Sequence, residues 1–431
     1  MTTFDQILPR LKEILGQHTD RLETIGQLLI NRDLNGRVRL IVSEDARRDE
    51  AAIMKLARIL SEALEVHAFP PEQLVLFEAD IEAVLYGAPS FTLEEFPTVR
   101  VVDRLATKND WTAISPVSPG APRIVFFSIK GGVGRSTALA ATAWALAQTG
   151  KQVLVLDLDL ESPGLSSALL PEERRPAFGI TDWLVEDLVD NGDAVFDDLI
   201  ATSTLSHDGE IFVVPAHGRE PGEYIVKLGR AWMAKSKAGG DRESWPERLS
   251  RLIDALEKRL APDVILIDSR AGIDEVAASC TTGLGAVLVL LFAIDGDQTW
   301  SGYEVLFKHW NRTGKVQEIR ERLQLVGAMI PDDETRANYF DGLRERAWDL
   351  FAGNLYDAIP AGESLAERFS FDESDESAPH YPWRIRWNRG FAALRSLHGR
   401  LQQVDETEIV AVFGPLIDGV NSTITPPGSD S

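Results

Sequence analysis

The sequence predicts an α/β protein with a mostly parallel sheet covered by helices on both faces, preceded by a small α/β or α+β N-terminal domain. From residue 123 onward, short apolar runs alternate with helical stretches, a pattern typical of parallel strands buried on both faces. Residues 115–122 contain three prolines and a glycine, which indicates a linker. A chain of 431 residues is long enough for two or three domains.

Residues 1–114 are expected to form the N-terminal domain. A helical spacing of apolar residues runs from Leu8 to Leu29, and a strand is expected at Val38–Val42. An amphipathic helix at Ile53–Leu64 and an apolar run at Leu74–Phe77 follow. No chemical motif stands out in this part, so we interpret it as an adaptor or docking domain of unknown type.

The larger domain is expected over residues 123–350. Residues 351–422 are predicted to form a C-terminal helical extension packed on that domain. The segment 423–431 is rich in Ser, Thr, Pro and Gly, which predicts a disordered tail. The strands of the larger domain are expected at Arg123–Phe127, Gln152–Leu156, Ile211–Val214, Val264–Ile267, Ala286–Phe292 and Leu323–Met329.

The strongest chemical signal is the glycine-rich segment Lys130–Thr137, which lies between an apolar strand and a helix. Its three glycines let the backbone turn tightly and bring N–H groups close to phosphate oxygens. The helix that follows presents its positive end, and Ser136 can offer a hydroxyl to Mg²⁺. The segment therefore predicts a phosphate-binding loop.

Carboxylates follow two of the predicted strands. Asp157 and Asp159 come after one strand, and Asp268 ends another. The carboxyl edge of a parallel sheet faces the ligand crevice, so these groups are expected near the loop. Asp268 can hold a Mg²⁺-bound water.

Three motifs in this order resemble the ParA/MinD family of P-loop ATPases, in the SIMIBI class. Lys130–Thr137 is similar to the family's deviant Walker A motif, Val153–Gly164 to switch I, and Asp263–Gly272 to Walker B and switch II. The resemblance implies a P-loop NTPase fold, ATP and Mg²⁺ as cofactors, and ATP turnover. It implies nucleotide contacts from Lys130, Gly131, Gly132, Val133, Gly134, Arg135, Ser136 and Thr137.

The resemblance also implies roles for single residues. Lys130 reaches across a homodimer interface to the partner's nucleotide, so Lys130 and Asp159 are the expected catalytic residues, with Asp159 positioning the attacking water. Ser136 is expected to bind the metal directly, and Asp157 and Asp268 through water. Face-to-face homodimerisation around two ATP molecules follows from this pattern.

Two residues depart from the general P-loop pattern. Ile129 stands where that pattern has glycine, and Arg135 where it has lysine. A planar guanidinium keeps the charge but is not a point ammonium, so ATP binding is a firmer expectation than hydrolysis, which is expected to be slow. Arg270 is expected to pair with Glu161 or Asp274 rather than with phosphate. The base preference is not assigned.

The net charge of the chain restricts the partners that we expect. There are 67 acidic and 44 basic side chains, a formal net charge of -23, which argues against DNA and anionic membranes as partners. The longest apolar run, 285–294, is half of the ~20 residues of a spanning helix, and the first residues lack a signal-peptide pattern. The protein is therefore expected in the cytoplasm.

These observations favour a nucleotide-driven homodimerisation switch that positions or regulates a protein partner through its N-terminal domain, in a bacterial conflict, defence or signalling system by analogy. One alternative is a nucleotide-binding scaffold with little hydrolysis. Another is a partition or positioning ATPase of the ParA/MinD type, which the acidic charge and the tail weaken. A tyrosine kinase usually carries a Tyr-rich tail, and a metal carrier needs more than the single Cys280.

Two further segments leave alternatives open. The acidic stretch Thr181–Val189 is interpreted as a solvated amphipathic helix, with partner docking as the alternative. The Trp- and Arg-rich segment 383–389 is interpreted as an amphipathic surface whose rings pack inward, with single-stranded nucleic acid as the alternative.

Overall fold

The computed structural model describes residues 2–85, 88–105, 110–237, 241–358, 368–391 and 396–425. The chain divides into two compact units. The first comprises Met1–Ala113 with Arg312–Lys315, and the second comprises Ile114–Asn311 with Val316–Ser431. Each unit has its own hydrophobic core.

The N-terminal unit is built on a five-stranded mixed sheet in the order β3-β2-β1-β5-β4. Strands β1/β5 and β2/β3 pair in parallel, and β1/β2 and β4/β5 pair antiparallel. Leu28 and Ile30 of β1 join a core with the long helices, whereas Leu29 faces a smaller cluster with α5, as period-two alternation requires. The elements are α1 (Ile7–Gly16), α2 (Thr19–Ile25), β1 (Leu28–Arg32), β2 (Val38–Ser43), α3 (Glu50–Leu64), α4 (Pro71–Leu74), β3 (Val75–Glu78), α5 (Ile81–Leu85), β4 (Ser90–Thr92) and β5 (Val99–Asp103).

The helical interpretation of Leu28 and Leu29 is wrong, because both residues lie in β1. Gly26 ends the preceding helix with φ +75°, a conformation that glycine adopts at little cost. The apolar spacing continued through this break, so the hydrophobic pattern alone did not reveal the change from helix to strand.

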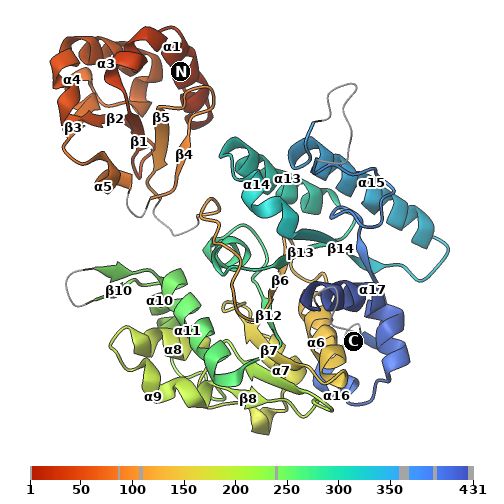
Figure 1. The fold of residues 1–431 in the computed structure, drawn as a ribbon. Coiled ribbons are helices and arrows are strands. Elements are labelled where there is room, and N and C mark those ends of the chain that lie inside the picture. Colours follow the sequence, from red (N-terminus) through yellow and green to blue (C-terminus); the bar gives the residue numbers. More distant parts are fainter. Residues whose placement is uncertain are drawn as a thin grey trace. The chain divides into compact units, whose positions relative to one another are not determined.

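The second unit contains an eight-stranded sheet in the order β15-β14-β13-β6-β12-β7-β9-β8 (Figure 1). Every neighbouring pair is parallel except β8/β9. The predicted fold class is confirmed, and each of the six predicted strands is present. The strands are β6 (Arg123–Ser128), β7 (Gln152–Asp157), β8 (Ala201–Thr202), β9 (Glu210–Val214), β12 (Val264–Asp268), β13 (Leu288–Ala293), β14 (Leu323–Ile330) and β15 (Trp383–Arg386).

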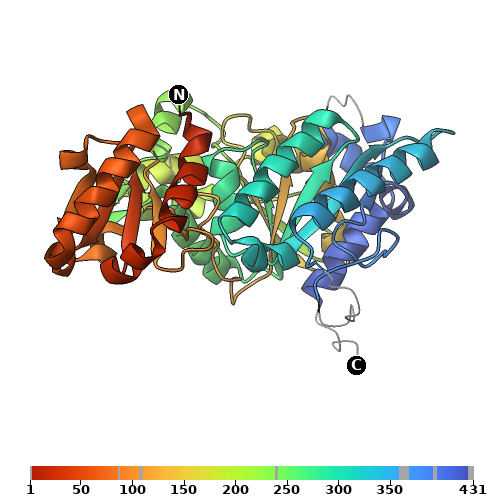
Figure 2. The same cartoon turned by 90° about the horizontal axis from the view of Figure 1, so that it is seen from above.

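Helices cover both faces of this sheet. On one face, Phe126 of β6 belongs to a core that also includes residues of α6 and α17, and these two helices lie side by side (Figure 1, Figure 2). On the other face, Phe127 meets Tyr303 of α13 edge to face, with 6.1 Å between ring centroids. The helices are α6 (Arg135–Gln148), α7 (Leu165–Leu169), α8 (Ile180–Asp187), α9 (Gly192–Phe196), α10 (Tyr224–Ala231), α11 (Trp245–Leu260), α12 (Glu275–Ala278), α13 (Asp297–Arg312), α14 (Val316–Ile319), α15 (Arg336–Asn354), α16 (Leu397–Leu401) and α17 (Glu406–Ile424).

The proline-rich segment 115–122 belongs to the second unit and is held by hydrogen bonds. The Ser115 N–H donates to the Thr282 carbonyl at 2.8 Å, and the Ala121 N–H donates to Glu257 Oε1 at 2.7 Å. Backbone groups that three prolines leave without helix or strand partners are satisfied in this way.

The C-terminal part contains helices, as predicted, and also an unpredicted strand. β15 pairs in parallel with β14 at the edge of the sheet, so this part extends the sheet as well as covering it. α17 continues to Ile424, two residues into the segment predicted to be a disordered tail. Residues 426–431 of that predicted tail lie outside the described residues. None of the helices in the described ranges combines the length and hydropathy needed to cross a bilayer.

A buried histidine connects segments within the C-terminal part. His380 is fully buried, with Nδ1 2.5 Å from the Tyr356 hydroxyl and Nε2 3.0 Å from the Glu373 carbonyl. A carbonyl only accepts, so Nε2 carries the proton and Nδ1 accepts from the tyrosine. Burial lowers the pKa of His380, and the ring is therefore neutral in the folded chain.

This histidine predicts an acid-dependent loss of stability. Because its folded pKa lies below its unfolded value, its contribution is fully present above the unfolded pKa and disappears as the pH falls through the folded pKa. We expect urea unfolding midpoints to fall between about pH 7.5 and about pH 5, and His380→Gln to flatten that fall. His207→Gln, at an exposed histidine, is the control; an unchanged slope in His380→Gln contradicts this account.

Candidate functional site

The site lies at the carboxyl edge of three neighbouring strands. β12 pairs with β6 on one side and β7 on the other, and Asp157 and Asp268 are register partners at their ends. The glycine-rich loop leaves the end of β6, the next strand position. The structure therefore brings the loop and the predicted carboxylates together, as the topology of a parallel sheet predicts.

The loop backbone has the conformation of an anion cradle. Gly132 and Gly134 have φ values of +76° and +81°, a region that L side chains rarely adopt. Among the described residues, the N–H groups of 131–134 donate no hydrogen bond to protein atoms, and α6 begins at Arg135. Unpaired N–H groups at the start of a helix form an anion-binding site.

Ile129, one of the two departures from the P-loop pattern, is accommodated by a glycine on the opposite element. A Cβ on Gly302 of α13 would lie 2.3 Å from Ile129 Cγ2. The absence of a side chain at Gly302 therefore creates the space that Ile129 fills. Nothing in the sequence near residue 129 pointed to this partner.

Arg135 does not extend freely toward the loop. Its Nε donates to Asp268 Oδ1 at 2.6 Å, and its Nη2 pairs with Asp159 Oδ2 at 3.1 Å. Its Nη1 donates to Ser128 Oγ at 3.1 Å, a partner that we did not predict. Burial lowers the pKa of Arg135, but Asp268 and Asp159 raise it by more, so the guanidinium stays charged.

Ser136 and Asp159 present oxygen atoms beside the loop. The Ser136 hydroxyl donates to Asp268 Oδ2 at 2.6 Å, which places the predicted metal ligands next to each other. The Asp159 Oδ1 atom is buried and has no hydrogen-bond partner, an unusual condition for a carboxylate oxygen. Hard oxygen donors of this kind suit Mg²⁺, so the residues present fit the group that the resemblance implies.

Asp157 lies at the end of β7 and is buried, as Asp268 is. It is fully buried and accepts the N–H groups of Leu165 at 3.1 Å and Asp159 at 3.3 Å. Burial, together with the charges of Asp268 and Asp159, raises the pKa of Asp157 to about 8. Its two oxygens hold the backbone of the segment that carries Asp159.

Lys130 and Thr137 flank the loop. Lys130 is exposed, and its ammonium has no polar partner within the described residues. It is therefore available to a ligand or to a second chain. Thr137 is half-buried in the first turn of α6.

The two predicted switch segments are joined by an ion pair. Arg270 Nη2 lies 2.5 Å from Glu161 Oε2, and Arg270 Nη1 lies 3.3 Å from Asp274 Oδ2. The predicted pairing of Arg270 is present, and it involves Glu161 and Asp274 together. A second, unpredicted link joins this segment to α10, because the Tyr224 hydroxyl donates to the Leu160 carbonyl at 2.5 Å.

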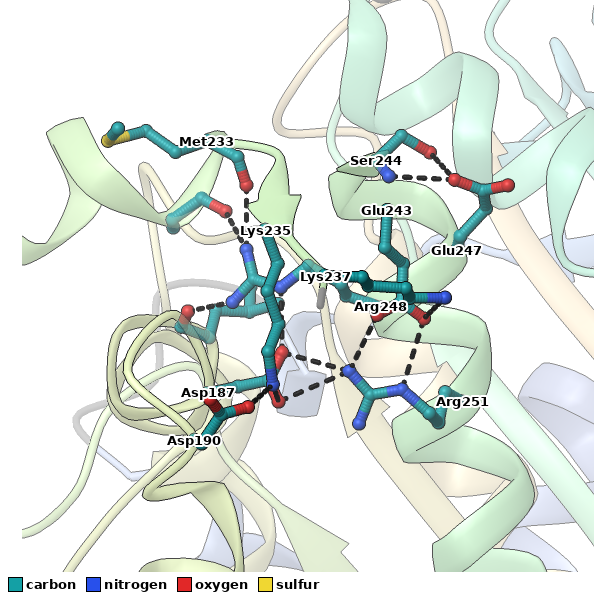
Figure 3. Close-up of polar contacts among 12 residues, drawn as sticks. Asp187, Asp190, Met233, Lys235, Lys237, Glu243, Ser244, Glu247, Arg248 and Arg251 are labelled. Atoms are coloured by element: carbon teal, nitrogen blue, oxygen red, sulfur yellow. Dashed lines mark hydrogen bonds and ion pairs between the residues drawn. The ribbon is translucent and has the colours of Figure 1, made fainter. Parts of the chain in front are cut away.

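The interpretation of Thr181–Val189 as a solvated helix is wrong. Asp187 of α8 is buried, and Figure 3 shows basic side chains converging on it. Arg248, fully buried, donates from Nε at 2.8 Å, and Lys235 lies at 3.0 Å. Burial raises the pKa of Asp187, but hydrogen bonds from Arg248, Lys235 and Arg251 lower it by more. These basic side chains, which come from distant parts of the sequence, compensate the charge of Asp187 and so allow α8 to be buried.

The Trp- and Arg-rich segment supports the inward-packing interpretation in part. Trp383 packs against the main core, and the Arg384 guanidinium lies 5.3 Å from the Phe340 ring centroid. Trp387 remains 46 % exposed.

Comparisons with known proteins identify the family of the larger unit. Residues 124–373, more than half of the chain, match the family model described as CbiA, the CobQ/CobB/MinD/ParA nucleotide binding domain. Over 67 residues the chain is 46 % identical to the putative arsenical pump-driving ATPase 1 of Aquifex aeolicus (strain VF5). These aligned residues make up 15 % of this chain and 17 % of that protein.

Over 170 residues it is 27 % identical to the septum site-determining protein MinD of Buchnera aphidicola subsp. Acyrthosiphon pisum (strain APS), covering 39 % of this chain and 49 % of that protein. The aligned parts thus span less than half the length of both curated relatives. Among solved structures, MinD complexed with Mg-ADP from Pyrococcus horikoshii OT3 is similar at 21 % identity and a TM-score of 0.41, covering 70 % of this chain and 96 % of that one. On the family match, the chain belongs to the CobQ/CobB/MinD/ParA family of nucleotide-binding domains.

Proposed function

We propose that this protein is an ATP-binding, Mg²⁺-dependent ATPase with slow turnover that acts as a nucleotide-driven homodimerisation switch and regulates a protein partner. The observation that carries the proposal is the glycine loop with its unpaired N–H groups next to Ser136, Asp159 and Asp268. Such a loop suits the phosphates of a nucleotide, and the oxygens beside it suit the metal ion that accompanies them.

The residues of the site have separate roles in this proposal. The N–H groups of 131–134 bind phosphate oxygens, and the Ser136 hydroxyl and a water held by Asp268 bind Mg²⁺. When bound, the metal ion neutralises the charge that develops on the phosphate oxygens. Asp159 orients the attacking water through the buried oxygen that lacks a protein partner. Asp157 holds the Asp159 segment in place from beneath, and we also propose that it contacts the metal shell through water.

Homodimerisation rests on Lys130. This lysine is exposed at the start of the loop, where it is free to reach the nucleotide of a second subunit. In this proposal Mg²⁺ binds together with the nucleotide, held by the phosphates as well as by the protein. We therefore expect dimer formation to depend on both Mg²⁺ and nucleotide.

The domain arrangement and the partner are also proposals. Residues 1–114 have a core of their own and carry no chemical motif, which supports a docking domain for a partner protein. We propose residues 115–122 as the boundary segment, 123–350 as the ATPase domain and 351–422 as its extension. The net charge of -23 favours a protein partner over DNA or an anionic membrane. We also propose a cytoplasmic location.

A scaffold with little hydrolysis is the second candidate. It is favoured by the contacts of Arg135, whose guanidinium is engaged by Asp159 and Asp268 rather than left free for a phosphate.

Nucleotide binding and turnover test the proposal on the full-length chain. We expect calorimetry to detect Mg²⁺–ATP binding, and phosphate release to be slow and to stop when EDTA removes the metal. Absence of binding contradicts the proposal. Binding without any phosphate release establishes the scaffold in its place.

A further inference from the structure

The contacts of Arg135 set it apart from an ordinary phosphate-loop cation. All three guanidinium nitrogens have partners: Asp268 at 2.6 Å, Asp159 at 3.1 Å and Ser128 at 3.1 Å. The side chain is only 7 % exposed. The arginine therefore lies between the two carboxylates instead of over the loop.

We propose that Arg135 is an internal cation that pairs with Asp159 and Asp268 and competes with Mg²⁺ and nucleotide for these carboxylates. This inference rests on the proposed function, since it assigns the same carboxylates to the metal and water. It makes Arg135 the residue that sets how strongly the two carboxylates resist binding of Mg²⁺ and nucleotide.

Electrostatics supports this role. Asp157, Asp159 and Asp268 gather at one buried edge, and Arg135 is the basic side chain that the described structure places among them. Burying carboxylates without a cation is strongly unfavourable. The guanidinium supplies positive charge to the same two carboxylates that are proposed to serve the metal ion and the water.

Competition follows from shared atoms. Arg135 Nε occupies Asp268 Oδ1, and the Ser136 hydroxyl occupies Asp268 Oδ2. Each carboxylate oxygen can accept a second hydrogen bond, so neither contact has to break when a metal-bound water approaches. The guanidinium charge beside the same carboxylate nevertheless repels Mg²⁺, which lowers the affinity for the metal–nucleotide complex.

Arg135→Lys separates this role from a purely structural one. A single ammonium cannot bridge two carboxylates and a hydroxyl as the planar fork does. We expect the nucleotide-free variant to unfold at a lower temperature than the wild type, yet to bind Mg²⁺–ATP about tenfold more tightly in calorimetry. A purely structural role of Arg135 predicts instead that the variant loses both thermal stability and affinity for Mg²⁺–ATP.

Mg²⁺ alone provides a second probe that does not depend on nucleotide. In Arg135→Ala the carboxylates lose their cation, so Mg²⁺ is expected to raise the unfolding temperature, or the refolding yield if the variant folds poorly. The wild type is expected to show no such rise. Arg251→Ala is the matched control, because Arg251 also pairs with a buried carboxylate, Asp187, at 2.9 Å but lies outside the site.

The outcomes separate the inference from the proposed function. Tighter ATP binding by Arg135→Lys, with Mg²⁺ rescue of Arg135→Ala only, supports the inference, even if the wild type binds ATP too weakly to measure. Wild-type binding that Arg135→Lys weakens overturns the inference and leaves the proposed function standing. Absence of ATP binding by both the wild type and Arg135→Lys overturns the inference and the proposed function. Mg²⁺ rescue that is equally large in Arg251→Ala overturns the inference alone.

Discussion

Replacing Asp159 with alanine is expected to preserve Mg²⁺–ATP binding while lowering ATP turnover about 10²–10⁴-fold, the usual contribution of a group that orients a reacting water. The reason lies in its environment. Asp159 Oδ1 is buried without a partner, while its other oxygen pairs with Arg135 at 3.1 Å. Burial, its largest influence, raises the pKa of Asp159. Loss of this carboxylate also frees Arg135 from a competing contact, so binding is not expected to weaken.

Asp208→Ala is the matched control for this measurement. Asp208 is exposed and precedes β9 at the amino edge of the sheet, since Glu210 pairs with Gln152 at the start of β7. Turnover and binding should stay at wild-type values in this control. Loss of ATP binding in Asp159→Ala, measured by calorimetry, means that Asp159 binds the nucleotide instead of positioning water.

Replacing Lys130 with alanine is expected to weaken the ATP-dependent dimer about 100-fold or more. Two symmetric contacts are lost at once, and a hydrogen bond to a charged group contributes about 1.5–3 kcal/mol. Nucleotide binding by a single chain should change less, because the N–H groups of 131–134 remain. Sedimentation equilibrium over a range of protein concentrations measures the dimer dissociation constant.

Lys151→Ala controls for the general loss of a positive charge. Lys151 lies just before β7, at the opposite edge of the sheet from the loop. This variant should dimerise as the wild type does. Equal dissociation constants for Lys130→Ala and the wild type rule out a bridging role for Lys130.

The features predicted correctly are those encoded over short stretches of sequence. A run such as Arg123–Phe127 can only be a buried strand, and the glycines that follow it demand a tight turn before a helix. Six strands and the phosphate loop followed from such local signals. Because parallel strands present their carboxyl ends at one edge, Asp157, Asp159 and Asp268 could be placed near the loop before any coordinates.

The features missed depend on partners far along the chain. Arg135 meets Asp268 across 133 residues, and the acidic helix α8 is buried because Arg248 reaches Asp187 from 61 residues away. The space for Ile129 comes from Gly302, whose sequence neighbours reveal nothing of that contact. A helix with several acidic residues is predicted to be solvated when only its own sequence is considered. The basic side chains that allow its burial lie on other elements and cannot be recognised from that segment.

The mass of the full-length chain in solution tests the central claim most directly. Light scattering after size exclusion should give one chain mass without nucleotide and with Mg²⁺–ADP, and twice that mass with Mg²⁺–ATP. The doubling should disappear in Lys130→Ala and persist longest in Asp159→Ala. A mass that is the same with and without Mg²⁺–ATP contradicts the nucleotide-driven switch.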